Sequence, residues 1–183
     1  DLPKTDKIYT DLKFFEKNFN GVMPREIVID TQKRYGLAGA RILPVLQKID
    51  SLSSYITAQK EMARPLSIAE GIKFVKQGFY EGDSSYYSIP DSYQAAFLNG
   101  YLKADKDIGN TKTNLTGFLP RFIDTPREST RISITIADNE TEKLPGMLRG
   151  ISKTTNDLFE STKFKITLTD VTSTFLEAIK LML

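Results

Sequence analysis

The pattern of apolar and polar residues along the chain has two periods, and each predicts one kind of secondary structure. A period of two is clearest at 131–137, where three isoleucines at even positions alternate with small or polar residues at odd positions. This alternation is typical of a strand that buries one face. The β-branched run 25–31 predicts a central strand whose Ile27 and Ile29 face the covering helices. Two further strands are expected at 118–124, where Pro120 favours a sheet edge or a bulge, and at 164–169.

Apolar residues that recur every three or four positions predict helices at 5–19, 42–60, 68–81, 91–102 and 142–160. Pro44 fits only in the first turn of the second helix, and Ser67 can cap the third. A polar loop is expected at 103–117. The stripes expected to face a core are Ile8, Leu12, Phe15 and Phe19; Leu46, Ile49, Leu52 and Ile56; Ile68, Ile72, Val75 and Phe79; and Leu144, Met147, Leu148, Ile151 and Leu158.

The order of these elements predicts an α+β fold. A strand and a helix come first, then a helical insertion at about 61–117, and then strand, strand, helix and strand. This is the split βαβ order of ferredoxin-like βαββαβ folds. Because crossovers are right-handed, we expect an antiparallel sheet in the strand order 4-1-3-2 with the helices on one face. One domain would then span 1–170, with the insertion packed at one end.

Composition narrows the functional classes. The chain has 183 residues, of which 40% are hydrophobic and 26% charged, as in a soluble globular domain. It contains no Cys and no His, which excludes disulfides, thiolate metal sites and every nucleophile that relies on a histidine base. A net charge of +2 gives no basic stripe for nucleic acid. Chemistry by a pair of carboxylates stays open, but we expect no catalytic residues, no metal and no cofactor.

An unusual density of aromatic residues lies between 74 and 101. Such a cluster can line a groove for an apolar ligand, and it can equally form the small core of the insertion. Tyrosines are the better candidates for a surface because they carry a polar hydroxyl. The candidate substrate-lining residues are Tyr80, Tyr86, Tyr87, Tyr93 and Tyr101.

Several stretches of the chain resemble one family of membrane transporters. They are 7–16 (Lys-Ile-Tyr-Thr-Asp-Leu-Lys-Phe-Phe-Glu), 21–24 (Gly-Val-Met-Pro) with the strand through Asp30, 65–68 (Pro-Leu-Ser-Ile), 131–133 (Arg-Ile-Ser) and 168–170 (Leu-Thr-Asp). With them the chain resembles the first large extracytoplasmic loop of bacterial resistance-nodulation-division (RND) exporters. The closer branch contains the mycobacterial large membrane proteins (MMPL), hopanoid exporters and Patched-like proteins. None of these stretches is a catalytic signature, so no functional residue is carried over.

The resemblance implies a porter-type subdomain in the periplasm, between the first and second membrane helices of a bacterial inner-membrane protein. It implies proton-driven export of lipids or other hydrophobic molecules, with the proton relay in membrane helices outside this chain. The implied partners are the hydrophobic or lipid substrate and the rest of the transporter, including its membrane helices and a second periplasmic loop. A homo-oligomer of the full protein is compatible with it.

Two other functions remain open from the residues alone. One is a free-standing periplasmic binding or adaptor module. The other is a carboxylate-dependent hydrolase, for which Glu70 and Glu81 flank the aromatic cluster as a candidate pair.

The last residues of the chain carry a separate prediction. Asp170 can cap a new helix, and apolar residues become frequent toward Leu183. We expect 171–183 to be the lead-in to the second membrane helix. Thirteen residues at about 1.5 Å each cannot cross a bilayer core of about 30 Å.

Overall fold

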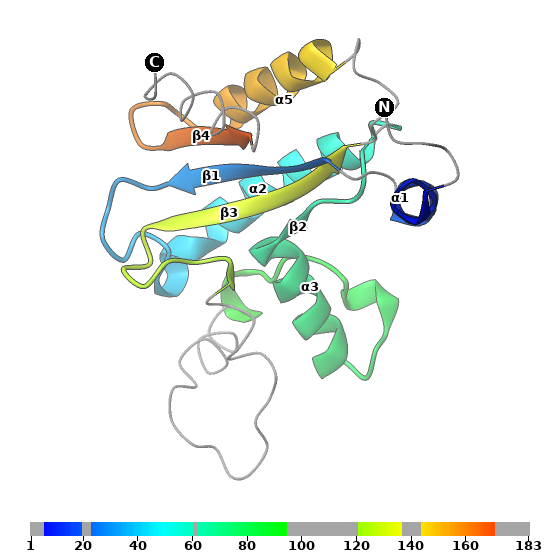
Figure 1. Ribbon diagram of the computed structural model, residues 1–183. Coiled ribbons are helices and arrows are strands. Elements are labelled where there is room, and N and C mark those ends of the chain that lie inside the picture. Colours follow the sequence, from blue (N-terminus) through cyan, green and yellow to red (C-terminus); the bar gives the residue numbers. More distant parts are fainter. Residues whose placement is uncertain (1–5, 20–22, 61, 95–120, 137–143, 171–183) are drawn as a thin grey trace.

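The fold is α+β and is organised around an antiparallel sheet (Figure 1). The computed structural model describes residues 6–19, 23–60, 62–94, 121–136 and 144–170. Within them the sheet has four strands in the order β2-β3-β1-β4, which confirms the predicted order 4-1-3-2. The strands are β1 Met23–Asp30, β2 Leu66–Ser67, β3 Ser129–Ile136 and β4 Lys165–Asp170; the helices are α1 Lys7–Phe19, α2 Ile42–Thr57, α3 Ile68–Phe79 and α5 Leu144–Leu158, with 3₁₀ turns η1 Gly39–Arg41 and η2 Ser84–Tyr86.

The central position of β1 confirms the prediction made for 25–31. β1 pairs antiparallel with β3 on one side and with β4 on the other, so Ile27 lies opposite Ile132 and Leu168. Cross-strand partners share a face of the sheet. Ile27, Ile29 and the three predicted inward isoleucines of β3 are all buried.

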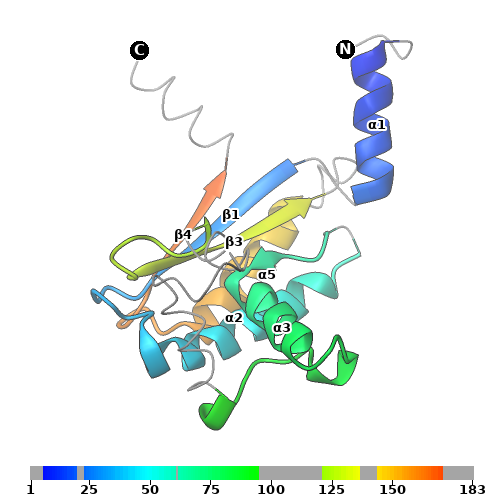
Figure 2. The same ribbon diagram turned by 90° about the horizontal axis from the view of Figure 1, so that it is seen from below.

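The helices α2 and α5 cover this apolar face, as Figure 2 shows. All four residues of the predicted α2 stripe are fully buried, and Pro44 lies in the first turn, where its missing N–H breaks no helical bond. On α5, Ile151 is buried as predicted and Phe159 just beyond the helix is buried as well. The core therefore lies between the sheet and these two helices.

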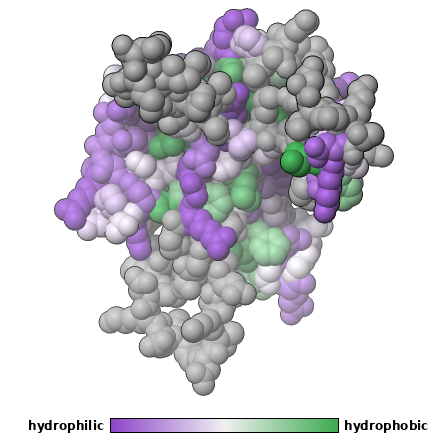
Figure 3. Space-filling model, viewed as in Figure 1, coloured by the Kyte–Doolittle hydropathy of each residue, from purple (hydrophilic) through white to green (hydrophobic). Residues whose placement is uncertain are grey.

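The opposite face of the sheet is polar. Glu26 of β1 and Arg131 of β3 form an ion pair across it at 3.3 Å, and the Thr169 hydroxyl donates to the carbonyl of Glu26 at 3.1 Å. Figure 3, in the same view as Figure 1, shows hydrophilic and hydrophobic residues interspersed over the coloured part of this side. The alternation in β1 and β3 is thus the alternation between a covered and an open face.

The edge strand beside β3 differs from the prediction. We expected 118–124 in this place, but the ladder partner is Leu66–Ser67, which pairs with Ser133 and Ile132. Of the predicted strand, the described residues 121–124 form one isolated bridge, Ile123 with Thr130. A buried Pro65 and a two-residue ladder give no measurable period in the sequence, so this strand could not be recognised there. Leu66–Ser67 is consequently a strand of the sheet, Met62 adds an isolated bridge to Ile136, and the helical part begins at Ile68.

Two predicted apolar stripes face a core only in part. Ile8 of α1 is 57% exposed, because α1 stands beyond the end of the sheet instead of packing on it (Figure 2). On α3, Ile68 and Ile72 are buried, whereas Phe79 in the last turn is 49% exposed. The hydrophobic period predicted both helices correctly, but it overstated how much of each helix lies against the sheet.

Some predictions concern residues outside the described part of the chain. Residues 92–94 are helical, as expected for the start of the 91–102 helix, and the remainder of that helix lies outside. The predicted loop at 103–117, the first half of the 118–124 strand and the lead-in at 171–183 also lie outside.

Candidate functional site

A pocket of about 410 Å³ lies between the C-terminal half of α2 and the first turns of α3. The α2 side presents mainly small hydroxyl-bearing residues, and the other side presents charged ones. The pocket is therefore lined mainly by residues with hydroxyl or charged groups, and none of the candidate tyrosines is among its lining residues. Its lining residues are Ser53, Ser54, Thr57, Ala58, Arg64, Glu70 and Lys73.

The start of α3 positions the charged wall. The hydroxyl oxygen of Ser67 accepts a hydrogen bond from the backbone N–H of Glu70 at 3.4 Å, which confirms the predicted N-cap. Ser67 and Glu70 have the Ser-x-x-Glu spacing typical of a helix start. With the first turn fixed, Glu70 and Lys73 are three residues apart and lie on one face of α3.

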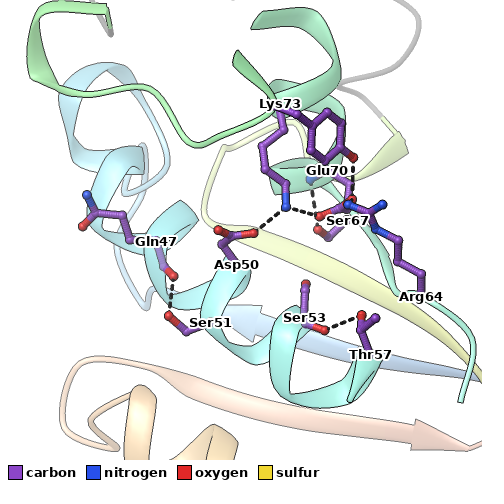
Figure 4. A network of polar contacts seen from close by, with 10 residues as sticks. Gln47, Asp50, Ser51, Ser53, Thr57, Arg64, Ser67, Glu70 and Lys73 are labelled. Atoms are coloured by element: carbon purple, nitrogen blue, oxygen red, sulfur yellow. Dashed lines mark hydrogen bonds and ion pairs between the residues drawn. The ribbon is translucent and has the colours of Figure 1, made fainter. Parts of the chain in front are cut away.

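Four charged residues and one tyrosine form a connected network beside the pocket (Figure 4). Glu70 pairs with Lys73, with Nη2 of Arg64 at 2.6 Å, and with the hydroxyl of Tyr87, which donates at 2.6 Å. Nζ of Lys73 also donates to Oδ1 of Asp50 on α2 at 2.6 Å. The network thereby joins α3 to α2 and to the chain segments before and after α3.

Two positively charged side chains also lie against the aromatic ring of Tyr87. The guanidinium carbon of Arg64 is 5.0 Å from the ring centroid, and Nζ of Lys73 is 5.1 Å from it. Both distances are within the range of cation–π attraction. Tyr87 is held by its hydroxyl and by its ring, so it anchors the loop that follows α3.

The network shifts the pKa values of its members. Burial by itself raises the pKa of Glu70, but hydrogen bonds from Lys73 and Tyr87 and the nearby positive charges outweigh burial and leave the pKa lowered. Burial likewise lowers the pKa of Lys73, yet its bonds to Asp50 and Glu70 leave that pKa raised. Burial and the bond to Glu70 raise the pKa of Tyr87. At neutral pH the carboxylate and the ammonium are therefore both charged, and the phenol is neutral.

The candidate tyrosines fall into separate environments. Tyr80 and Tyr86 are half-buried and stack with ring centroids 3.7 Å apart, whereas Tyr93 is 92% exposed. Tyr87 points its hydroxyl at Glu70. Tyr101 lies outside the described residues. The structure thus brings Tyr80 and Tyr86 together, and a shared groove for all five stays a prediction.

Sequence reasoning missed most of the polar site. Glu70 was considered only as a partner for Glu81, which is exposed beyond the end of α3 in a left-handed conformation with φ 57°. The Ser-x-x-Glu spacing and the Glu70–Lys73 pair are local signals that could have indicated a charged face on α3. No local signal links Asp50 to Lys73, which are 23 residues apart.

Comparisons with protein-family models, with curated proteins and with solved structures found no match to this chain. The described residues include no helix that is both long and apolar enough to span a membrane. They also include no group of three or more acidic side chains arranged to hold a metal ion.

Proposed function

We propose that this chain is an extracytoplasmic domain that binds or conducts substrate in a proton-driven exporter of lipids or other hydrophobic molecules. The observation that carries the proposal is the pairing of β1 with β4. Arg25 near the start of β1 lies opposite Asp170 at the end of β4, so the chain joins and leaves the sheet at the same end (Figure 1). This arrangement suits a domain inserted between two consecutive membrane helices, because both connections then leave the sheet toward one membrane surface.

We further propose that the architecture is ferredoxin-like and of the porter type. Two strand–helix–strand units, β1-α2-β2 and β3-α5-β4, interleave to give the order 4-1-3-2. The segment from Ile68 up to the start of β3 is then an insertion between the two units. This topology agrees with the resemblance to the first periplasmic loop of RND exporters, which supports the proposal on sequence.

The aromatic insertion is the proposed contact for hydrophobic cargo. Tyr93 is open to solvent, and the stacked pair Tyr80 and Tyr86 offers a preformed aromatic surface at its partly exposed edge. Tyr87 has a different role in this proposal, because its bond to Glu70 holds the loop that carries Tyr86. Aromatic faces of this kind contact acyl chains without needing specific hydrogen bonds.

The reading frame around this domain provides the first test. The proposal expects a membrane span of about 20 apolar residues on each side of the domain. A phosphatase that is active only in the periplasm, fused after residue 60 in the full protein, should be active. A reading frame without either membrane-spanning segment would contradict the exporter proposal and would favour a free-standing binding or adaptor module.

A transport assay tests the cargo surface. In cells that carry the full protein, efflux of a fluorescent lipid should fall severalfold in Tyr93→Ala and Tyr86→Ala. Tyr35→Ala is the matched control, because Tyr35 is 49% exposed but lies in the β1–α2 connection, outside the aromatic insertion. Equal efflux in all three variants, at equal protein levels, would rule out the aromatic insertion as the cargo contact.

A further inference from the structure

The hydroxyl of Ser53 is a buried polar group that forms no hydrogen bond with any described residue. Ser53 lines the pocket, exposes 3% of its surface, and its Oγ has no partner among the described residues. Figure 4 shows this hydroxyl pointing from α2 toward the cluster of Arg64, Glu70 and Lys73. Buried hydroxyls are nearly always hydrogen-bonded, so an exception that faces a pocket is a candidate contact for a bound ligand.

The charged side of the pocket has more uncommitted hydrogen-bond donors than uncommitted acceptors. Both carboxylate oxygens of Glu70 are occupied, by Lys73 on one and by Arg64 and Tyr87 on the other. Arg64 pairs with Glu70 through Nη2 and its side chain is 57% exposed, so its other N–H groups can donate to a ligand. Together with the Ser53 hydroxyl they leave a wall that suits acceptor oxygens.

The geometry points to a binding site for a small oxyanion, a phosphate group, with Arg64 and Ser53 as its principal donors. An arginine beside a hydroxyl is a common pair for such groups, because the guanidinium supplies charge and two donors in one plane. The two carboxylates beside the pocket, Glu70 and Asp50, are paired with the two cations Lys73 and Arg64, so they repel the anion less than unpaired carboxylates would. A volume of about 410 Å³ is ample for a phosphate or for the head of a phospholipid. This inference goes beyond the exporter role and does not depend on it.

Titration of the ¹⁵N-labelled chain tests the site by amide chemical shifts. One arm uses inorganic phosphate, a second uses short-chain phosphatidic acid below its micelle concentration, and a sodium chloride series at equal ionic strength is the blank. We expect saturable shifts at residues 53–57, 64 and 70–73 with phosphate groups and none with chloride. Tighter binding of phosphatidic acid would assign the site to a lipid headgroup, and equal binding would assign it to free phosphate.

Two variants make the test decisive. Ser53→Ala should weaken phosphate binding about tenfold while the melting temperature stays the same or rises, because removing an unpartnered buried hydroxyl does not harm the fold. Arg64→Gln should weaken binding by a similar factor, and as an exposed residue it tests the site even if Ser53→Ala misfolds. Ser51→Ala, on the exposed side of α2, is the matched control and should bind normally. Absence of saturable shifts, or unchanged binding in both pocket variants, would overturn the inference.

Discussion

The hydroxyl of Tyr87 donates a 2.6 Å hydrogen bond to Oε2 of Glu70, 17 residues earlier in the chain. This bond closes the loop after α3 back onto the first turn of the helix. Its acceptor is a carboxylate with a lowered pKa, so the bond is charge-assisted and of the stronger kind. The loop after α3 is therefore tied through Tyr87 to a residue at the other end of the helix.

Replacing Tyr87 by phenylalanine tests this dependence. Tyr87→Phe keeps the ring beside Arg64 and Lys73 and removes only the hydroxyl, so we expect the free energy of unfolding to fall by about 1–2 kcal/mol in urea titrations. Tyr93→Phe is the control and should change it by less than about 0.5 kcal/mol, because Tyr93 is 92% exposed. A similar small effect at both positions would show that the bond to Glu70 does not stabilise the fold.

Glu70 should make stability fall in acid. Its pKa is lower in the folded chain than its ordinary value of 4.5, so its contribution is complete above that value. The contribution is lost as the pH falls through the lowered pKa, because the folded state then has to take up a proton it resists. The measurement is urea unfolding from pH 7 to pH 2. In Glu70→Gln the stability at pH 7 should drop by on the order of 2 kcal/mol.

The same variant should flatten the acid branch of the curve. Glu160 is a useful control, because its pKa is also lowered, by its hydrogen bond with Lys163, but it is an exposed residue. Glu160→Gln should leave the acid branch nearly unchanged. An acid branch that keeps its full slope in Glu70→Gln would mean that other carboxylates dominate the acid response.

Lys73 and Tyr87 should act together at alkaline pH. The pKa of each is raised in the folded chain, so the stability that their protonated forms contribute is present below their ordinary values of 10.5 and 10.0 and is lost above them. Unfolding followed up to pH 11 should show this loss in the wild type. Tyr87→Phe removes one of the two titrating groups and should make the loss smaller. An alkaline limb equally steep in the variant would exclude a contribution from Tyr87.

Ile134 provides a quantitative test of which face of β3 is buried in the core. Ile134 is 1% exposed on the covered face of β3, so Ile134→Ala should cost about 2–5 kcal/mol and Ile134→Val about 1 kcal/mol. Ser133→Ala, one residue earlier on the open face, should cost less than about 0.5 kcal/mol. Comparable losses at 133 and 134 in thermal or urea unfolding would contradict the assignment of the faces.

Two glycines on α5 should respond differently to alanine. Apart from its neighbours in the helix, no described residue lies within 4 Å of a β-carbon placed on Gly146, whereas the hydroxyl oxygen of Tyr55 lies 2.7 Å from one on Gly150. Gly146→Ala should raise the free energy of unfolding by about 0.5–1 kcal/mol through helix propensity. Gly150→Ala should gain less or lose, and Tyr55→Phe in the same chain should restore the gain. Equal gains at both glycines in the presence of Tyr55 would show that the side chain moves aside freely.

Local patterns determined much of the fold. The alternation in β3 and the 3.6-residue period of α2 predicted which side chains are buried, because each pattern follows from the geometry of one element. Ser67 was predicted as an N-cap for the same reason. Ile27 and Ile29 were assigned correctly to the covered face of a central strand, and the right-handed crossover rule supplied the strand order.

Only the tertiary structure decided the edge of the sheet, the exposure of two helices and the polar site. Leu66–Ser67 forms the edge strand because the tertiary structure brings its backbone beside the free edge of β3, whose backbone groups it pairs with. Two residues are too few to show a period in the sequence. Ile8 is exposed because an amphipathic pattern does not specify what a helix packs against. The bond from Lys73 to Asp50 joins two helices, so it exists only once the core has brought α2 and α3 together.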